Sequence, residues 1–144
     1  MARTEVIPQT KANIGEGHLF YHFSLSTSAT NAPNPNYEHQ IAFFEVRLSL
    51  FSSHYPCLII PRLHQSHFTE LKYGTLSGAT GPDNTLRWMV GGQTKWSTDL
   101  SPSTWYNFAY DIDFSAKTVG LWASEGSAPP VSYTHLTLPT NREV

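Results

Sequence analysis

Carboxyl groups in segments rich in β-forming residues are the side chains of this sequence best suited to chemistry. Two carboxyls with different pKa values can act as general acid and general base in hydrolysis. Apolar neighbours raise a carboxyl pKa, whereas a nearby arginine lowers it. Glu45 follows Phe43 and Phe44, while Glu5 lies two residues from Arg3 on the same face of an extended segment. These surroundings favour a protonated Glu45 and an ionised Glu5.

Residues 37–45 contain a second carboxyl group, that of Glu38, which is an alternative to Glu45 as the catalytic group. Strict strand alternation puts Glu45 on the face of Ile41 and Phe43, and Glu38 on the other face with Gln40. A β-bulge near Phe43 and Phe44 would re-aim Glu45, and bulges are frequent next to active sites. Without a bulge, Glu38 is the rival carboxylate. Acidic residues in strands ordinarily face solvent. This is the expectation for Glu38 itself and for the other acidic strand residues, Glu70, Asp111 and Asp113.

Composition limits the classes of protein that fit. The chain has 144 residues, of which 40% are hydrophobic and 13% aromatic, with a net charge of −2. This length predicts one domain, and the charge argues against nucleic acid as a partner. The single cysteine cannot form an internal disulfide, no apolar run approaches the ~20 residues that span a bilayer, and no signal peptide is visible.

The elements that must position the carboxyls are short strands. Apolar and polar residues alternate over 18–26, with Leu19, Tyr21 and Phe23 on one side, and again over 105–114. Further strands are expected at 37–45, 68–73, 86–90, 94–97 and 118–124, with a hairpin turn at Gly91-Gly92. No window shows a sustained helical stripe. We therefore predict an all-β sandwich.

Several strings of the sequence resemble glycoside hydrolase family 131, secreted fungal β-glucanases with a β-jelly-roll fold. The strings are NAPNPNYEHQIAFFE, SHFTELKYG, LRWMVGGQTKW and WYNFAYDIDFSAKTVGLWAS, and the resemblance extends from about Arg3 to Ser127. It implies a jelly-roll sandwich and hydrolysis of β-1,3, β-1,6 or β-1,4 glucan. It also implies that Glu5, in Arg-Thr-Glu-Val, and Glu45, which ends Phe-Phe-Glu, are the catalytic pair.

The same resemblance implies a secreted monomer whose partner is β-glucan, without a cofactor or a membrane. The alternative is a carbohydrate-binding or structural β-sandwich without hydrolytic activity, because a fold does not determine a function. Seven histidines are present, but no three of them show a ligand spacing that predicts a metal site.

Substrate-binding residues are expected around the catalytic motif and on aromatic faces. Trp88 and Trp96 flank the Gly-Gly turn and are the better candidates for stacking on sugar rings, whereas Trp105 and Trp122 are expected to pack in the core. His39 and His67 flank the Glu45 motif, where they orient substrate or serve no function. The full set of expected substrate-binding residues is Arg3, Glu38, His39, Gln40, His67, Trp88 and Trp96.

Residues 46–65 do not match their surroundings. In the family, Phe-Phe-Glu runs directly into Ser-His-Phe-Thr-Glu-Leu-Lys-Tyr-Gly, whereas here 20 residues separate them. The insert opens with Val46 and closes with Gln65, whose codons can supply the terminal dinucleotides of an intron. It contains no Gly, Asp, Glu, Lys, Asn or Thr. We interpret it as a retained intron, with a natural surface loop as the alternative; the flanking strands are expected to remain neighbours.

The last stretch, residues 131–144, resembles translated sequencing-adapter sequence and is expected to be non-native, without a strand partner. Residues 1–130 are then a partial catalytic domain, interrupted by the insert. A partial domain leaves open sheet edges, which favour aggregation. We expect these 144 residues alone to have little or no activity.

Overall fold

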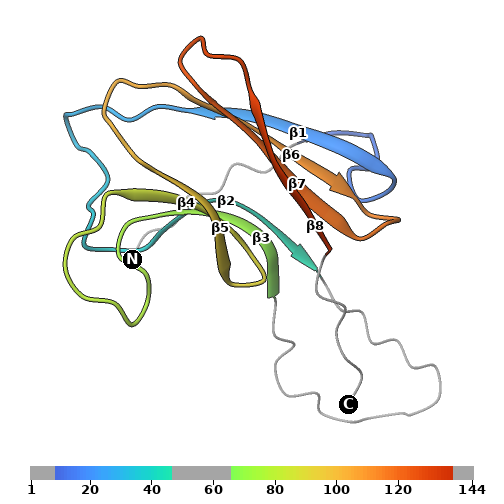
Figure 1. Cartoon of the computed structure of the whole chain (residues 1–144), viewed down its shortest axis with the longest axis horizontal. Coiled ribbons are helices and arrows are strands. Elements are labelled where there is room, and N and C mark those ends of the chain that lie inside the picture. Colours follow the sequence, from blue (N-terminus) through green and yellow to red (C-terminus); the bar gives the residue numbers. More distant parts are fainter. Residues whose placement is uncertain (1–8, 47–65, 138–144) are drawn as a thin grey trace.

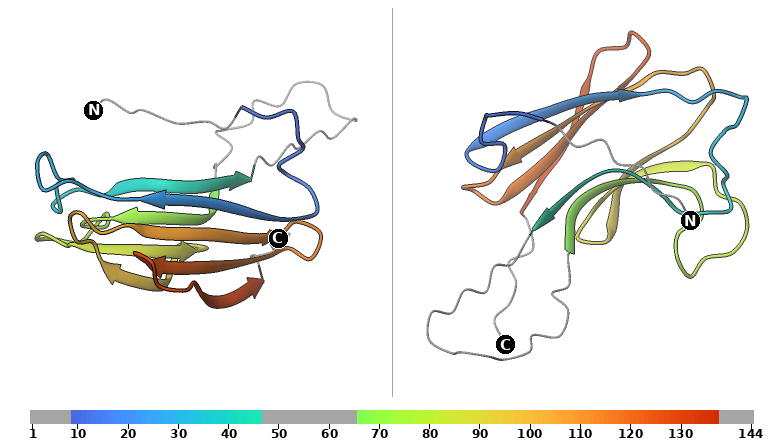
Figure 2. Two further views of the ribbon diagram at one scale, coloured as in Figure 1. Left: turned by 90° about the horizontal axis from the view of Figure 1, so that it is seen from above. Right: turned by 180° about the vertical axis from the view of Figure 1, so that it is seen from behind.

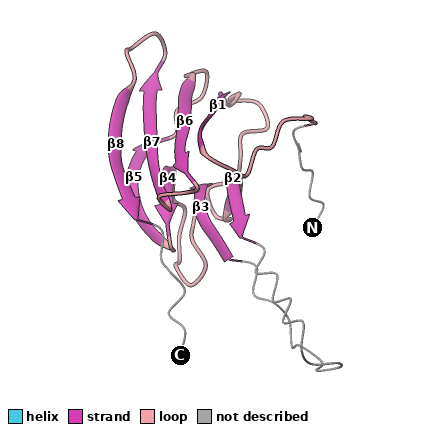
Figure 3. Ribbon diagram, turned by 90° about the vertical axis from the view of Figure 1, so that its right-hand side faces the viewer, coloured by secondary structure: helices cyan, strands magenta, loops and turns pink. Residues whose placement is uncertain are grey.

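The computed structural model describes residues 9–46 and 66–137, and these residues form strands and loops. The strands are β1 (His18–Leu25), β2 (His39–Val46), β3 (Ser66–Tyr73), β4 (Thr85–Val90), β5 (Gln93–Asp99), β6 (Tyr106–Asp113), β7 (Thr118–Glu125) and β8 (Val131–Thr137). All described elements are strands (Figure 3). No helix in this part of the chain has the length and apolar character needed to cross a bilayer.

Two antiparallel four-stranded sheets face each other (Figure 1). One sheet has the order β1-β6-β7-β8 and the other the order β2-β3-β4-β5. Seen from above, the strands of both sheets lie along roughly the same axis (Figure 2), as in aligned sandwiches. The predicted all-β sandwich is confirmed.

Inward-facing aromatic and aliphatic residues of both sheets form the core between them. The predicted alternation in β1 is confirmed, because Tyr21 and Phe23 pack on the core while Phe20 is exposed. It is confirmed in β6 as well, where Tyr106, Phe108, Tyr110 and Ile112 are all buried. The side chains on the opposite face of each strand are therefore available to build outward-facing sites.

Tight turns hold neighbouring strands in register. Gly91 and Gly92 both have positive φ, which the predicted turn between β4 and β5 requires. Between β6 and β7, the Asp113 carboxylate accepts hydrogen bonds from the backbone N–H groups of Ser115 and Ala116. Gly74, at the end of β3, approaches Tyr37 so closely that a Cβ would stand 2.0 Å from its carbonyl oxygen. This close approach fixes the start of β2 beside the end of β3.

The two unusual segments have different outcomes. Strands β2 and β3 pair as predicted despite the insert between them, and residues 47–65 lie outside the described residues. The prediction that the last stretch has no strand partner is wrong, because residues 131–137 form β8 and pair with β7. Val119 and Leu136 are register partners there, and Leu136 packs on the core.

Candidate active site

Five polar side chains form a connected group on β2, on β3 and just before β2. Lys72 Nζ lies 3.0 Å from Glu38 Oε1 and 3.2 Å from Glu70 Oε1. The other oxygen of Glu70 lies 3.1 Å from His67 Nδ1, and Gln40 Nε2 lies 3.2 Å from the same nitrogen. His67 Nδ1 can donate to the Glu70 carboxylate or accept from the Gln40 amide, but it cannot do both at once. We call Glu38, Gln40, His67, Glu70 and Lys72 the polar cluster.

Two irregularities in the β2–β3 ladder bring these residues to one face. Gln40 pairs with Lys72 but Ala42 pairs with Leu71, so Ile41 is an extra residue on β2. Phe44 pairs with Thr69 but Glu45 pairs with His67, so Phe68 is an extra residue on β3. A bulge reverses the alternation beyond it. The expected bulge in this region is therefore present at two places.

The polar cluster points away from the sandwich core. Leu71 and Tyr73 belong to the core, so the alternate residues Glu70 and Lys72 project from the opposite face. Phe43 lies on the same outward face and stacks on the His67 ring at a centroid distance of 4.4 Å. Glu70 is nonetheless only 6% exposed. A carboxylate this buried needs partners, and Lys72 and His67 supply them.

Charge pairing sets the pKa values within the polar cluster. Burial pushes the pKa of Glu38 upward, but the backbone N–H of Ser77 and the Lys72 ammonium outweigh it, so the pKa lies below its ordinary value. Burial likewise pushes the pKa of Lys72 downward, and the carboxylates of Glu38 and Glu70 reverse this, so the pKa is raised. Both groups are held in their charged forms, with one ammonium between two carboxylates.

Comparison with known proteins agrees with this architecture. The family described as the glycoside hydrolase 131 catalytic N-terminal domain matches residues 1–142. The chain belongs to glycoside hydrolase family 131. Among solved structures, the GH131 β-glucanase catalytic domain from Podospora anserina is similar, with 45% identity and a TM-score of 0.73 over 93% of this chain. The family 131 catalytic domain from Coprinopsis cinerea has 46% identity and a TM-score of 0.71 over 96% of this chain.

This member of family 131 spans about half the length of those solved structures, 49% and 50% respectively. No curated protein sequence matches it.

The residues expected to form the catalytic pair of this family 131 chain are described only in part. Glu5 and its neighbour Arg3 lie outside the described residues. The backbone of Glu45 is described, and it pairs with His67 near the end of the β2–β3 ladder. The register therefore places the Phe-Phe-Glu motif directly beside the polar cluster.

Of the expected substrate-binding residues, the structure brings Glu38, Gln40 and His67 together. His39 is separated from them, because its Nε2 bonds the Asn34 carbonyl oxygen at 2.9 Å and its ring packs near Tyr73. Its position between Glu38 and Gln40 puts it on the other face of β2. His39 therefore lies apart from the polar cluster.

The tryptophan predictions are wrong. Trp88 has no exposed surface, and its Nε1–H donates to Thr69 Oγ1 at 2.7 Å in the core. Trp96, the register partner of Trp88, packs against Phe108 and Tyr133 between the sheets. The Trp88 ring therefore offers no free face for stacking, and the partly buried Trp96 ring packs on the core. Conversely, the two tryptophans expected in the core lie outside it: Trp105 is 57% exposed, and Trp122 is half-buried on the outward face of β7.

Two acidic residues expected to face solvent are buried instead. Glu70 is one. Lys72 shares its face of β3 by simple alternation, but His67 reaches that face only because of the bulge at Phe68, which the sequence does not reveal. Asp111 is the other, at 3% exposure, and it accepts a hydrogen bond from Trp122 Nε1 at 3.3 Å. The alternating aromatic pattern around Asp111 is a usable signal that it lies within a strand, and the position of β6 between β1 and β7 buries it.

In the described part of the chain, no group of three or more His, Cys, Asp or Glu residues is arranged to hold a metal ion. The chemistry available at the polar cluster is that of carboxylates, an ammonium, an amide and an imidazole, which suits proton transfer and hydrogen bonding to hydroxyl groups.

Proposed function

We propose that this chain is part of a β-glucanase that hydrolyses β-1,3, β-1,6 or β-1,4 glucosidic bonds, with Glu5 and Glu45 together as the pair of general acid and general base. Membership of family 131 supports the reaction class. The motifs Arg-Thr-Glu-Val and Phe-Phe-Glu support the choice of residues. The expected cellular location is extracellular, where polymeric glucan is found, and the expected state is a monomer.

The observation that carries this proposal is the position of Glu45, which follows the paired residue Phe44 directly, at the end of the β2–β3 ladder beside the polar cluster. Glucan is neutral and rich in hydroxyl groups, and a cluster with fixed donors and acceptors suits it. Lys72 and Gln40 supply donors, while Glu38 and Glu70, each paired with Lys72, supply acceptors. The polar cluster would then orient the sugar ring next to the catalytic carboxyl.

The geometry of the pair follows from the reaction. If the anomeric configuration inverts, a water molecule must fit between the acid and the base, and the two carboxyl groups should lie roughly 6.5–9.5 Å apart. If it is retained, the separation should be nearer to about 5–5.5 Å. A crystal structure with a bound oligosaccharide would measure this distance for Glu5 and Glu45. Their location on opposite sides of the sandwich would contradict the assignment.

The test of function is release of reducing sugar from laminarin and from a cellulosic glucan by the full-length protein without residues 46–65. Glu5→Gln and Glu45→Gln should each lower turnover by about 10³-fold or more, because each removes a proton-transferring group. Glu16→Gln, an exposed acid in the loop before β1, is the matched control and should leave turnover unchanged. Glucan binding without any release of sugar would favour the non-catalytic alternative.

A further inference from the structure

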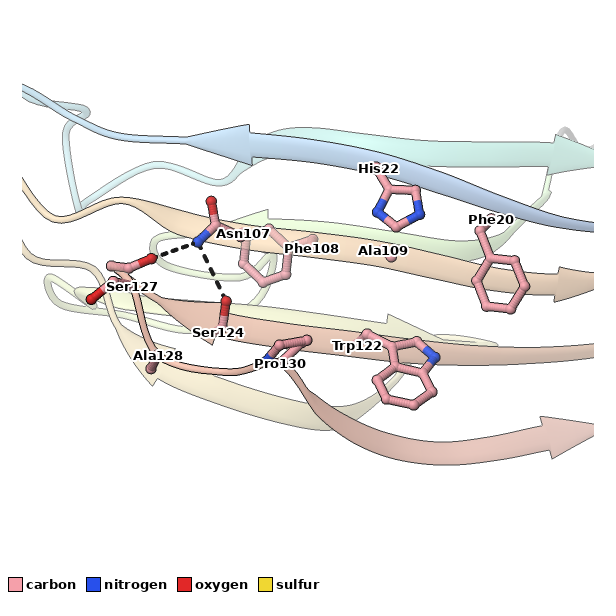
Figure 4. Close-up of a pocket in the computed structure, with 11 residues that line it drawn as sticks. Phe20, His22, Asn107, Phe108, Ala109, Trp122, Ser124, Ser127, Ala128 and Pro130 are labelled. Atoms are coloured by element: carbon pink, nitrogen blue, oxygen red, sulfur yellow. Dashed lines mark hydrogen bonds between the residues drawn. The ribbon is translucent and has the colours of Figure 1, made fainter.

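A groove of about 550 Å³ lies on the sheet opposite to the polar cluster (Figure 4). Its lining comes from the outward face of β1, β6 and β7 and from the loop after β7. Phe20, His22 and Trp122 contribute aromatic rings, and Asn107, Ser124 and Pro130 close one end. None of the described residues that line it is an acid, a lysine or an arginine.

Strand register explains why a groove forms here. His22, Ala109 and Trp122 are successive partners across β1, β6 and β7, so a methyl group lies between two rings. In the next row, Phe20 pairs with Asp111, and Asp111 pairs with Gly120, which has no side chain. His22 on β1 and Trp122 on β7 therefore flank the small Ala109, and Phe20 has no large side chain opposite it on β7, which leaves a trough with aromatic walls.

The indole of Trp122 is held in place from below. Its Nε1–H donates to Asp111 Oδ2 at 3.3 Å, and His18 Nε2 lies 2.5 Å from the other oxygen of the same buried carboxylate. A ring fixed in this way loses little conformational freedom when a ligand stacks on it. The Trp122 ring is therefore held in position before a ligand binds.

The polar end of the groove offers hydrogen-bonding groups at its rim. Asn107 Nδ2 donates to Ser124 Oγ at 3.3 Å and to the Gly126 carbonyl oxygen at 3.0 Å (Figure 4). Ser24 Oγ donates to Asn107 Oδ1 at 2.8 Å. These amide, hydroxyl and carbonyl groups are uncharged, so they complement hydroxyl groups and not phosphates or carboxylates.

We propose that this groove is a second carbohydrate site, which binds the pyranose rings of a neutral glucan away from the polar cluster. The apolar face of a pyranose ring packs on Phe20 and Trp122, while its hydroxyl groups bond the rim at Asn107 and Ser124. The absence of charge among the lining residues favours a neutral ligand. The choice of β-glucan as the ligand rests on the proposed function.

The test follows the indole N–H signals of the 144-residue chain by NMR during titration with laminarihexaose, with cellohexaose in parallel. The chain carries Glu45→Gln, which prevents turnover. Trp122→Ala identifies the Trp122 signal by its loss. We expect that signal to shift on titration, whereas the signal of Trp88, in the core, should stay in place. The exposed Trp105 lies outside the groove lining and is the matched internal control.

A second variant gives a quantitative readout without touching the buried Asp111. Phe20 is 50% exposed, so Phe20→Ala should leave the fold intact while weakening the laminarihexaose affinity by about tenfold, measured from the Trp122 shift. Trp105→Ala should leave the affinity unchanged. An unmoved Trp122 signal would overturn the proposal and leave this face to a protein partner. An equal loss with Trp105→Ala would also overturn it. Glucan hydrolysis at Glu45 is measured separately, so either proposal can fail alone.

Discussion

The two outward faces of this sandwich carry opposite chemistry on the same kind of scaffold. On β2 and β3, two carboxylates, an ammonium and an imidazole are linked by contacts of 3.0–3.2 Å. On β1, β6 and β7, the side chains that line the groove are aromatic rings, the His22 imidazole, and neutral amide and hydroxyl groups. The first face has carboxylates and an ammonium that can orient hydroxyl groups, whereas no carboxylate or ammonium lines the groove of the second face.

The difference shows that burial of a carboxylate does not by itself indicate catalysis. Glu70 and Asp111 are both at least 94% buried. Glu70 shares Lys72 and His67 with a chain of other polar groups that ends beside Glu45. Asp111 holds the Trp122 indole and His18, and so orients a ring. The partners of a buried acid, more than its burial, indicate what it does.

The largest expected effect on stability comes from a substitution in the core, compared with one on an outward face. Trp88→Ala removes a fully buried ring and leaves Thr69 without its partner, and it should lower the free energy of unfolding by about 3–5 kcal/mol. Trp122 is only half-buried, so Trp122→Ala should cost less. Denaturant unfolding followed by circular dichroism measures both. A Trp88→Ala protein as stable as the parent would mean that the ring does not pack in the core.

The next effect tests the polar cluster. Glu70→Gln leaves the Lys72 ammonium with Glu38 alone and removes the anion beside His67, and it should lower the free energy of unfolding by about 1–3 kcal/mol. Glu38→Gln is the matched control. The side chain of Glu38 is 28% exposed, so its loss should cost less, about 0–1 kcal/mol. Equal costs for the two variants would argue against Glu70 as the centre of the cluster.

The sequence predicts the two faces with unequal success. In β1 and β6 one face packs on a continuous core, so simple alternation identifies Tyr21 and Tyr110 as inward and Phe20 as outward. In β2 and β3 the extra residues Ile41 and Phe68 interrupt the alternation. Bulges arise from the pairing of two strands, and the residues of one strand do not reveal them.

Pairing between strands also explains why the tryptophan positions differ from those expected. Trp88 and Trp96 flank a Gly-Gly turn, which predicts a surface position. The register makes them direct partners with both rings turned inward, next to the core residues Leu71 and Phe108. Composition and alternation thus predict the fold class, whereas the facing of individual rings depends on pairing across strands.

The two faces should also respond to pH in opposite directions. The pKa of Glu38 is lowered on folding, so its contribution to stability is present above its ordinary value of 4.5 and is lost as the pH falls through the folded value. The pKa of His18 is raised by its hydrogen bond to Asp111, so its contribution is present below 6.5 and is lost as the pH rises through the folded value.

Thermal unfolding across pH measures these windows. Glu38→Gln should flatten the melting temperature profile only on the acidic side, and His18→Asn should flatten it only above about pH 6.5, since each variant removes one titrating group. His18 is half exposed, so its effect should be the smaller of the two. A His18→Asn profile that changes on the acidic side instead would contradict the assigned partner.

An expected gain in stability concerns residues 46–65, which we interpret as a retained intron. Their deletion leaves four residues, Glu45, Ser66, His67 and Phe68, between the register partners Phe44 and Thr69. Four residues are a suitable length for a hairpin loop. The ladder from Phe44 and Thr69 to His39 and Tyr73 should persist, and shortening the loop should stabilise the fold by about 1–2 kcal/mol. Denaturant unfolding measures the gain. A mature transcript that lacks the nucleotides for residues 46–65, which are present in genomic DNA, would confirm the interpretation; a transcript that always keeps them, or a deletion that unfolds the protein, would make the segment a genuine loop.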